Sequence, residues 1–445
     1  MLAFSKNGYS SKMPSMVSPV VLFSSIVLKV IRIPPMVGLP LQTSGIVVIL
    51  SKNVIFVFFL QNYKMKLETL SIHAGNHSDP TTGAVVSPLI LSTTFERAED
   101  GSTLEGRDIY TRASNPNRRA LEEKLAALEG GSEAIAFASG QAATMSIFHS
   151  LGGNTHVILP DDIYYNTKVI IDNLYANFGL TCTAVDMTDL GAIKRAIKKN
   201  TKLIWIETPS NPSLKVTDIQ AVVKIAKAKN ILVACDNTWA TPFFTRPFEF
   251  GVDLIMHSTT KYFGGHSDIL GGVVILPPAP SLGAGAAIRT FQTVGGAVPS
   301  PFDCWLLSRS LSTFAIRMPV HAQNAMRLAT FLEAQPQIEK VNYPGLKSNE
   351  YHKVAKKQMC NVGGVPCFGG MMSILVKGGQ NEAMELASKL KIFKHATSLG
   401  GVESLIEHRF SVEGTHSSSP ENLLRISVGI ENIEDLIADF IQAFQ

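Results

Sequence analysis

The stretch ILVACDNTWATPFFTRPFEFGVDLIMHSTTKYFGG, residues 231–265, decides the fold. It contains two mostly apolar runs, Ile231–Asp236 and Val252–His257, joined by a stretch of helical character. Short apolar runs with helices between them predict parallel strands of a sheet that is buried on both faces. Both runs end in polar residues, and the carboxyl ends of parallel strands are where such sheets bind ligands.

The same pattern continues on both sides of this stretch. Further short apolar runs cover Ala134–Ala138, His156–Leu159, Leu203–Glu207 and Gly272–Leu276. Asn115-Pro116 predicts the start of a helix and Gly130-Gly131 predicts its end, because these residues are preferred at those positions. The chain is therefore predicted to be an α/β protein with a mostly parallel sheet.

The pattern changes after about residue 315, which predicts a second and smaller α/β domain. A helix is expected at His321–Ala334, followed by candidate strands at Gly370–Val376 and Leu424–Val428. The expected organisation is an N-terminal arm at 65–112, a large domain at 113–315 and a C-terminal domain at 316–445.

Composition limits the class of function. The chain has 445 residues and a formal net charge of only +4, without a concentrated basic stripe, so nucleic-acid binding is not expected. Its five cysteines are scattered and form no CxxC pair, which predicts free thiols in a reducing compartment such as the cytoplasm and no metal site.

Residues 1–64 differ from the rest of the chain. They contain no Asp or Glu and six Lys or Arg, together with two interrupted apolar runs at Val20–Ile33 and Gly45–Leu60. Neither run reaches the ~18 uninterrupted apolar residues of a membrane span. We expect a non-native extension upstream of Met65, and a targeting or anchoring segment is the alternative.

The residues after the strand Val252–His257 suit cofactor chemistry. Lys261 can condense with an aldehyde, and the hydroxyl groups of Ser258 and Thr260 can donate to a phosphate. An isolated lysine is more often a solvated surface charge. Asp236 ends the preceding strand, where it either caps the next helix or faces a protonated ring nitrogen, and its closeness to the Lys261 segment favours the ring.

Other strand ends add candidate binding residues. Gly140, in Ser139–Thr144, opens a helix whose free N–H groups can bind phosphate, unless this is an ordinary turn. Tyr164 can stack on a planar ring or pack on the surface. Asn211 can bond a ring hydroxyl or only shape its turn. Arg425, a charge inside an apolar strand, suits a substrate carboxylate or a buried ion pair.

Taken together, these motifs resemble the Cys/Met-metabolism family of pyridoxal 5′-phosphate (PLP) enzymes, over about residues 65–445. The motifs that carry the resemblance are YTR (110–112), NPNR (115–118), SGQAA (139–143), DDIYY (161–165), ETPSNP (207–212), CDNTWATP (235–242), HSTTKYFGGHSD (257–268), GAVPSPFDCW (296–305), SLGGVESL (398–405) and LLRISVGIE (423–431). The resemblance implies the aspartate-aminotransferase-like fold type I of PLP-dependent transferases.

The resemblance also implies a role for each matching residue. Lys261 would form the Schiff base and shuttle protons, Asp236 would pair with the pyridinium nitrogen, and Tyr164 would stack on the ring and assist proton transfer. The phosphate would be held by Gly140, Gln141, Ser258 and Thr260, and, from a neighbouring subunit, by Tyr110 and Arg112. The substrate carboxylate would be held by Ser398, Leu399 and Arg425. A homo-oligomer follows, at least a dimer and commonly a tetramer.

The family's reactions act on the side chains of small sulfur-containing amino acids or activated homoserine. A γ-replacement or γ-elimination like that of cystathionine γ-synthase and γ-lyase is the leading hypothesis. Methionine γ-lyase or O-acylhomoserine sulfhydrylase chemistry is the alternative, and cystathionine β-lyase chemistry a minor one. Two departures count against tight recognition of cystathionine: Val169 stands where many members have Arg, and Thr397 where many have Glu. A membrane-attached or non-catalytic relative is the hypothesis from another class.

Overall fold

The computed structural model describes residues 43–51, 54–61, 65–104, 106–279, 283–361, 363–414 and 419–445. The chain divides into two compact units, Met1–Met65 and Lys66–Gln445. In the first unit, β1 (Thr43–Ser51) and β2 (Val54–Gln61) pair antiparallel. The predicted extension at 1–64 lies largely outside the described residues, so its origin stays a prediction. Within the described part of the chain, no helix is long and apolar enough to cross a membrane.

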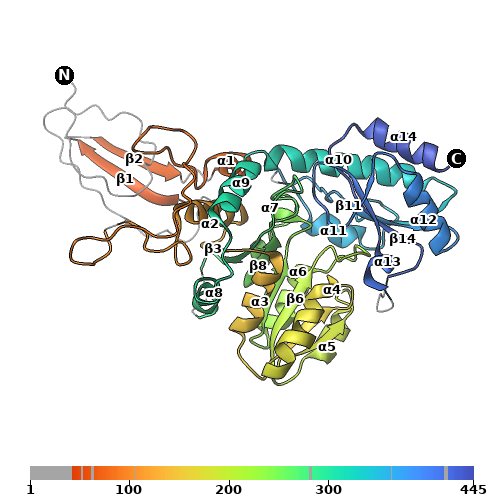
Figure 1. Cartoon of the computed structure of the whole chain (residues 1–445), viewed down its shortest axis with the longest axis horizontal. Coiled ribbons are helices and arrows are strands. Elements are labelled where there is room, and N and C mark those ends of the chain that lie inside the picture. Colours follow the sequence, from red (N-terminus) through yellow and green to blue (C-terminus); the bar gives the residue numbers. More distant parts are fainter. Residues whose placement is uncertain are drawn as a thin grey trace. The chain divides into compact units, whose positions relative to one another are not determined.

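The second unit is built on a seven-stranded sheet with the order β3-β9-β8-β7-β6-β4-β5 (Figure 1). β9 runs in the opposite direction to the other six strands, and it therefore pairs antiparallel with both β3 and β8. The strands are β3 (Glu133–Phe137), β4 (His156–Pro160), β5 (Thr181–Val185), β6 (Thr201–Glu207), β7 (Leu232–Asp236), β8 (Leu254–Ser258) and β9 (Gly272–Leu276). The predicted α/β fold with a mostly parallel sheet is confirmed.

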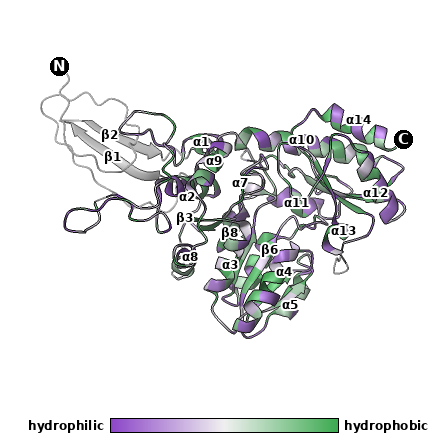
Figure 2. Ribbon diagram, in the orientation of Figure 1, coloured by the Kyte–Doolittle hydropathy of each residue, from purple (hydrophilic) through white to green (hydrophobic). Residues whose placement is uncertain are grey.

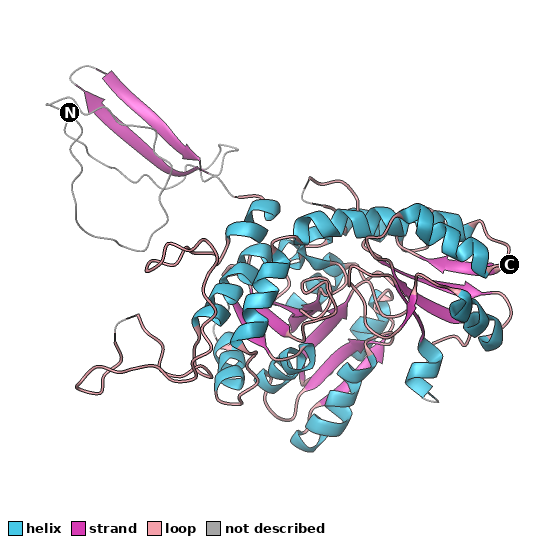
Figure 3. Ribbon diagram, turned by 45° about the horizontal axis from the view of Figure 1, so that its top comes forward, coloured by secondary structure: helices cyan, strands magenta, loops and turns pink. Residues whose placement is uncertain are grey.

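Both faces of this sheet are buried, as the continuous apolar runs predicted. Along β6, Ile204 and Ile206 pack into one hydrophobic cluster, whereas Leu203 and Trp205 pack into another on the opposite face. Alternate side chains of a strand point to opposite faces, so a strand covered on both sides must be apolar throughout. Figure 3 shows the strands of this sheet lying among helices.

The helices around the sheet carry hydrophobic and hydrophilic residues in alternating bands (Figure 2). Their bounds are α1 (Leu67–His73), α2 (Pro116–Glu129), α3 (Gly140–Ser150), α4 (Tyr165–Val169), the π-helix η1 (Ile170–Tyr175), the 3₁₀ helix η2 (Ala176–Phe178), α5 (Leu190–Ala196), α6 (Ile219–Lys227), α7 (Thr241–Phe244), the 3₁₀ helix η3 (Pro247–Phe250), α8 (Ala284–Thr293), α9 (Pro301–Leu311) and α10 (Phe314–Glu333). Such banding lets one side of each helix face the sheet and the other face water.

A five-stranded sheet with the order β10-β11-β14-β13-β12 follows α10. Its elements are β10 (Ile338–Asn342), α11 (His352–Gln358), β11 (Met371–Val376), α12 (Gln380–Lys389), β12 (Lys394–His395), β13 (Leu405–His408), α13 (Arg409–Glu413), β14 (Leu423–Ser427) and α14 (Ile433–Ala443). This is the second, smaller α/β region expected after residue 315, with the predicted strands at β11 and β14. The exact domain boundaries remain a prediction.

Three elements differ from the sequence-based expectation. The helix expected at His321–Ala334 is the later part of α10, which begins at Phe314 and continues through Pro319. α1 lies within the N-terminal arm at 65–112, for which no helix was predicted. β5 went unpredicted because its residues are only half-buried or exposed, so they form no continuous apolar run.

The ends of α2 follow the prediction. The side chain of Asn115 accepts a hydrogen bond from the Asn117 N–H, which caps the helix ahead of Pro116. At the other end Gly130 adopts a left-handed conformation with a φ of 73°, which favours glycine.

Candidate active site

A cavity of about 530 Å³ opens at the carboxyl ends of the parallel strands. Its walls come from both sheets, because residues after β3, β4, β6, β7 and β8 face residues of the smaller sheet. The predicted site residues that line it are Gly140, Gln141, Tyr164, Asn211, Asp236, Ser258, Thr260, Lys261, Ser398, Leu399 and Arg425. Segments far apart in the sequence therefore meet in one place.

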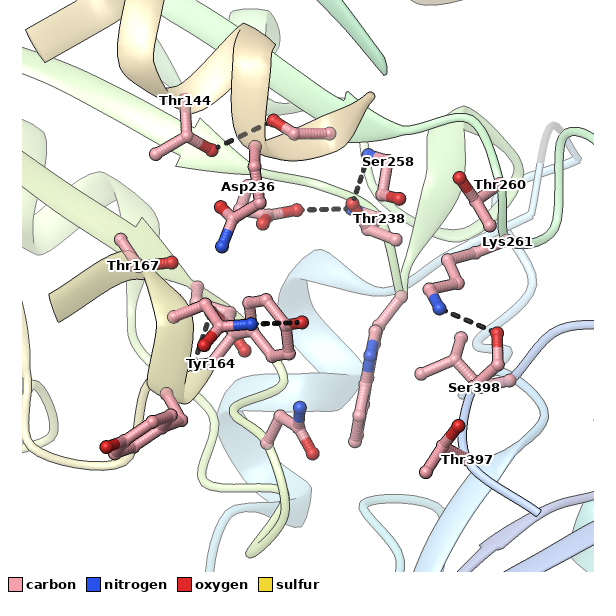
Figure 4. A pocket seen from close by; sticks show the side chains of 18 of the residues that line it. Thr144, Tyr164, Thr167, Asp236, Thr238, Ser258, Thr260, Lys261, Thr397 and Ser398 are labelled. Carbon is pink, nitrogen blue, oxygen red and sulfur yellow. Dashed lines mark hydrogen bonds between the residues drawn. The ribbon is translucent and has the colours of Figure 1, made fainter. Parts of the chain in front are cut away.

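Lys261 follows β8 and points into the cavity (Figure 4). Its Nζ donates a hydrogen bond to the Ser398 Oγ at 2.7 Å. Burial, and after it the positive charge of Arg425, lower the pKa of Lys261 to about 8. A larger share of this amine is thus uncharged near neutral pH than in an ordinary lysine, which makes it a better nucleophile.

Asp236 and Glu207 place two carboxyl groups side by side at the floor of the cavity. They are the last residues of β7 and β6 and are direct partners in the parallel pairing of these strands. Burial and then the charge of Asp236 raise the pKa of Glu207 well above its usual range. Burial also raises the pKa of Asp236, but hydrogen bonds from Thr238, including one of 3.0 Å from its N–H, oppose this shift. Burial and the neighbouring carboxylate therefore disfavour the charged form more strongly at Glu207 than at Asp236.

The N-terminus of α3 forms a narrow cradle beside β8. The first N–H groups of a helix lack partners within the helix, so they are free to bind an anion. A Cβ atom on Gly140 would lie 2.9 Å from the Ser258 Cβ, so only glycine permits this approach. The Ser139 side chain caps the helix by accepting from the Ala142 N–H. The Thr260 hydroxyl donates to the Gly271 carbonyl at 3.3 Å.

Tyr164 lies over the floor of the cavity at the start of α4 (Figure 4). Its N–H donates to the Glu207 Oε2 at 3.1 Å, so Glu207 holds the backbone that carries this ring. The Tyr164 hydroxyl accepts a hydrogen bond of 3.0 Å from the Asn166 side chain.

Arg425 is buried on β14 and is held by contacts from several elements. It donates to the Asn211 Oδ1 at 3.1 Å and to the Ser398 carbonyl at 3.0 Å, and it pairs with Glu407. The sequence left two hypotheses open for Arg425, a buried ion pair and a guanidinium that faces a ligand cavity. The geometry of Arg425 is compatible with both. Ser398 has a φ of 86°, a left-handed conformation that is costly for serine and common at binding sites.

Tyr110 and Arg112 are not among the residues that line this cavity. Arg112 lies 5.6 Å above the Tyr110 ring and donates to the Thr293 carbonyl at 2.6 Å. The Tyr110 side chain is exposed. This arrangement leaves both residues outside the chain's own cavity, so their expected role toward a neighbouring subunit remains a proposal.

Several residues of the cavity were missed from the sequence. Glu207 ends an apolar strand just as Asp236 does, so the same signal was available for it. Thr238 stands two residues after Asp236 in the same motif. Arg409 and its partner Glu407 follow the apolar pair Leu405-Ile406, but no pattern in the sequence linked them to the other site residues.

The chemistry of these donors fits PLP. Lys261 offers an amine for the aldehyde, and Asp236 offers a carboxylate for the ring nitrogen. The cradle at Gly140, which a Cβ would fill, offers N–H groups for the phosphate. Within the described residues, no group of three or more His, Cys, Asp or Glu is arranged to hold a metal ion.

This fold and this site define a PLP-dependent enzyme of the α/β type. The chain belongs to the Cys/Met metabolism PLP-dependent enzyme family, whose match covers residues 68–445. The predicted family, fold class and cofactor are thereby confirmed, and the chain is an enzyme of sulfur amino-acid metabolism.

Named relatives span several reactions of this family. The chain is 42% identical over 389 residues to a cystathionine β-lyase of Coxiella burnetii, covering 85% of this chain and 97% of the relative. It is also 42% identical over 384 residues to a cystathionine γ-synthase of Mycobacterium leprae, covering 85% and 96%. A cystathionine γ-lyase of Lactobacillus plantarum, solved with L-serine, matches with a TM-score of 0.80 and 38% identity, covering 85% and 98%.

Proposed function

We propose that the protein cleaves or forms the carbon–sulfur bond at Cγ of cystathionine-like amino acids. The observation that supports the proposal is that Lys261, Asp236 and Arg425 line one cavity, so that an amine, a carboxylate and a guanidinium are available to one ligand. Relatives named γ-synthase, γ-lyase and β-lyase support trans-sulfuration chemistry, and the similar identities do not choose among them.

When bound, PLP withdraws electrons from the bonds at the substrate Cα. Asp236 keeps the proton on the ring nitrogen, because its charge pairs with the protonated form. Glu207 supports this state by remaining neutral beside Asp236 and by fixing the backbone of Tyr164. The Tyr164 ring, which lines the same cavity, would stack on the cofactor ring.

Arg425 fixes the substrate through its α-carboxylate, with Asn211 holding the guanidinium in plane. Ser398 and the Leu399 backbone complete the carboxylate site. This position directs Cα and Cβ toward Lys261, whose amine can take the proton from Cα and then move a proton at Cβ. The Ser398 hydroxyl, which already contacts the Lys261 Nζ, orients the amine for both transfers.

The phosphate end of the cavity has no basic side chain of this chain among its described lining residues. We propose that Tyr110 and Arg112 of a second copy complete the phosphate site. The active form would then be at least a dimer, and a tetramer of two such dimers is the proposed assembly. We propose the cytoplasm as the compartment, because the cysteines of the chain are free and a reducing compartment keeps thiols in this state.

A product assay tests the proposed reaction. The purified enzyme is given cystathionine, methionine, or O-acetyl- or O-succinylhomoserine with cysteine or sulfide, and thiols, 2-oxo acids and ammonia are quantified. Cleavage at Cγ of cystathionine adds water and yields cysteine, 2-oxobutanoate and ammonia. Cleavage at Cβ would instead yield homocysteine, pyruvate and ammonia.

Lys261→Ala serves as the control, and it should lose both the yellow colour of the Schiff base and all turnover. Homocysteine and pyruvate as the main products would replace the proposed reaction by the β-lyase alternative. Turnover of methionine or of acylhomoserine with sulfide, without action on cystathionine, would favour the second hypothesis. A colourless wild-type protein would contradict the proposal altogether.

A further inference from the structure

Charged residues at the two ends of α13 form part of the cavity wall. β13 leads directly into α13, and Arg409, Val412 and Glu413 line the same cavity as Lys261. None of the roles proposed above uses them.

Arg409 is buried yet only partly paired. Its side chain donates to the Glu407 Oε2 at 3.0 Å and pairs with Glu413, whose other carboxylate oxygen accepts from the Ser419 hydroxyl at 3.2 Å. Its Nε has no hydrogen-bond partner among the described residues, although Arg409 as a whole is only 6% exposed. A buried donor without a partner is costly, so the two carboxylates do not satisfy Arg409 completely, and the residue also lines the cavity.

Arg409 stands beside the proposed α-carboxylate site. The Glu407 Oε2 contacts both Arg409 and Arg425, so the two guanidinium groups flank one carboxylate. The charge of Arg409 also contributes to the lowered pKa of Lys261, after burial and Arg425. When the α-carboxylate of a substrate binds Arg425, Arg409 is therefore a second cation that the side chain of the substrate can reach.

Two positions at which many members of the family carry a charged residue, 169 and 397, are neutral in this chain. Thr397 lines the cavity next to Ser398 (Figure 4), and its hydroxyl carries no charge. Val169 is not among the lining residues of this cavity. If the substrate has a charged far end, other side chains must bind it.

We infer that Arg409 and Glu413 form a subsite for a second amino-acid group at the far end of the substrate side chain. The distal carboxylate would bind Arg409, and the distal ammonium group would bind Glu413. Arg409, Arg425, Glu407 and Glu413 already balance in charge, so a ligand that brings one charge of each sign preserves that balance, whereas a lone carboxylate does not. This inference rests on the proposed function and makes these two residues determinants of specificity.

The competing role is purely structural. Arg409 could serve only to hold Glu407 in place and thereby keep Arg425 aligned. In that case every substrate would depend on Arg409 equally, because every substrate carries the α-carboxylate. The two roles therefore differ in one respect: only in a subsite does the loss of affinity on substituting Arg409 depend on the group at the far end of the substrate.

The test compares binding of cystathionine, which has a distal amino-acid group, with binding of methionine, which has none. Both are titrated calorimetrically into PLP-loaded full-length protein that carries Lys261→Ala, so that no turnover occurs. Adding Arg409→Met should raise the Kd for cystathionine by about 10- to 100-fold, through loss of charge-assisted hydrogen bonds, and should change the Kd for methionine less than about threefold. Glu413→Gln should act in the same direction.

Two further variants separate the subsite from general charge effects. Arg327→Met removes another arginine that is paired with a glutamate, Glu434, but is exposed, and it should leave both Kd values unchanged. Lys168→Met removes the cation next to Val169, which pairs with Asp172 and lines a neighbouring cavity, and it should also have no effect.

Equal weakening of both ligands by Arg409→Met, or an unchanged Kd for cystathionine, would overturn the inference while leaving the proposed reaction intact. A selective loss of cystathionine affinity in the Lys168→Met variant would place the subsite at Lys168 and would also overturn the inference. If Arg409→Met does not fold, Glu413→Gln decides alone by the same comparison. Failure of the Lys261→Ala protein to bind either ligand would overturn both the inference and the proposed function.

Discussion

Lys261 shows how one residue acquires its reactivity from its surroundings. In the sequence it is one of many lysines, but in the fold it is half-buried, feels the charge of Arg425 and donates a hydrogen bond to Ser398. Burial and a nearby positive charge both disfavour the protonated amine, so they lower its pKa in the same direction. The amine is thus prepared for condensation with an aldehyde.

The rate of cofactor uptake should report this pKa. Only the unprotonated amine attacks an aldehyde, so uptake of PLP by the apoprotein should accelerate about tenfold per pH unit at low pH and level off above about pH 8. Stopped-flow absorbance between pH 6 and 10 measures it. A rate that keeps rising to the ordinary lysine pKa of about 10.4 would show that Lys261 is not perturbed.

At the scale of elements, the site depends on how closely α3 approaches β8. Gly140 is the first residue of α3, and it has no room for a Cβ against Ser258. The same contact brings the free N–H groups of the helix to the end of the strand that leads to Lys261. The cradle is therefore a property of the packed pair and not of either element alone.

Gly140→Ala should weaken cofactor binding. The added methyl group would push α3 away from β8, and overpacking of this kind costs about 1–3 kcal/mol, which corresponds to roughly a 5- to 150-fold rise in the Kd for PLP. Equilibrium dialysis measures the Kd. Gly379→Ala, at the start of α12, is the matched control, because the nearest atom to its new Cβ is a flexible Glu382 oxygen at 3.7 Å. Equal affinity of the Gly140→Ala and wild-type proteins would refute the role of this approach.

At the scale of the whole molecule, the site is proposed to need two copies of the chain. Arg112 lies outside its own cavity, so its partner would be the phosphate bound near Lys261 of another copy. Each site would then combine Lys261 from one copy with Arg112 from the other.

Mixing two inactive chains tests this arrangement. Lys261→Ala and Arg112→Ala homo-oligomers should each be nearly inactive, but co-refolded mixed dimers place both mutations in one site and leave the other site intact. Roughly a quarter of wild-type activity is expected from an equal mixture, because half of the random dimers are mixed and each has one working site of two. Activity is measured on the mixture and on mixed dimers purified through two different affinity tags, which should retain about half of wild-type activity. No recovery in purified mixed dimers would contradict a shared site.

The sequence alone was sufficient for the fold class, and it named residues that the fold brings to one cavity. Continuous apolar runs mark strands buried on both faces, and polar residues at their ends mark a ligand site, because both signals are local. The same locality explains the missed elements: β5 has no continuous apolar run, and α10 continues through Pro319 where the sequence suggested a later start.

Only the tertiary structure decided which distant charges act together. The pairing of β6 with β7 set Glu207 beside Asp236, and the packing of the second sheet brought Arg409 and Arg425 to the same cavity as Lys261. It also left Tyr110 and Arg112 outside that cavity. Local patterns show where a strand ends, whereas pKa values and ion pairs depend on burial and on distances between segments that are far apart in the chain.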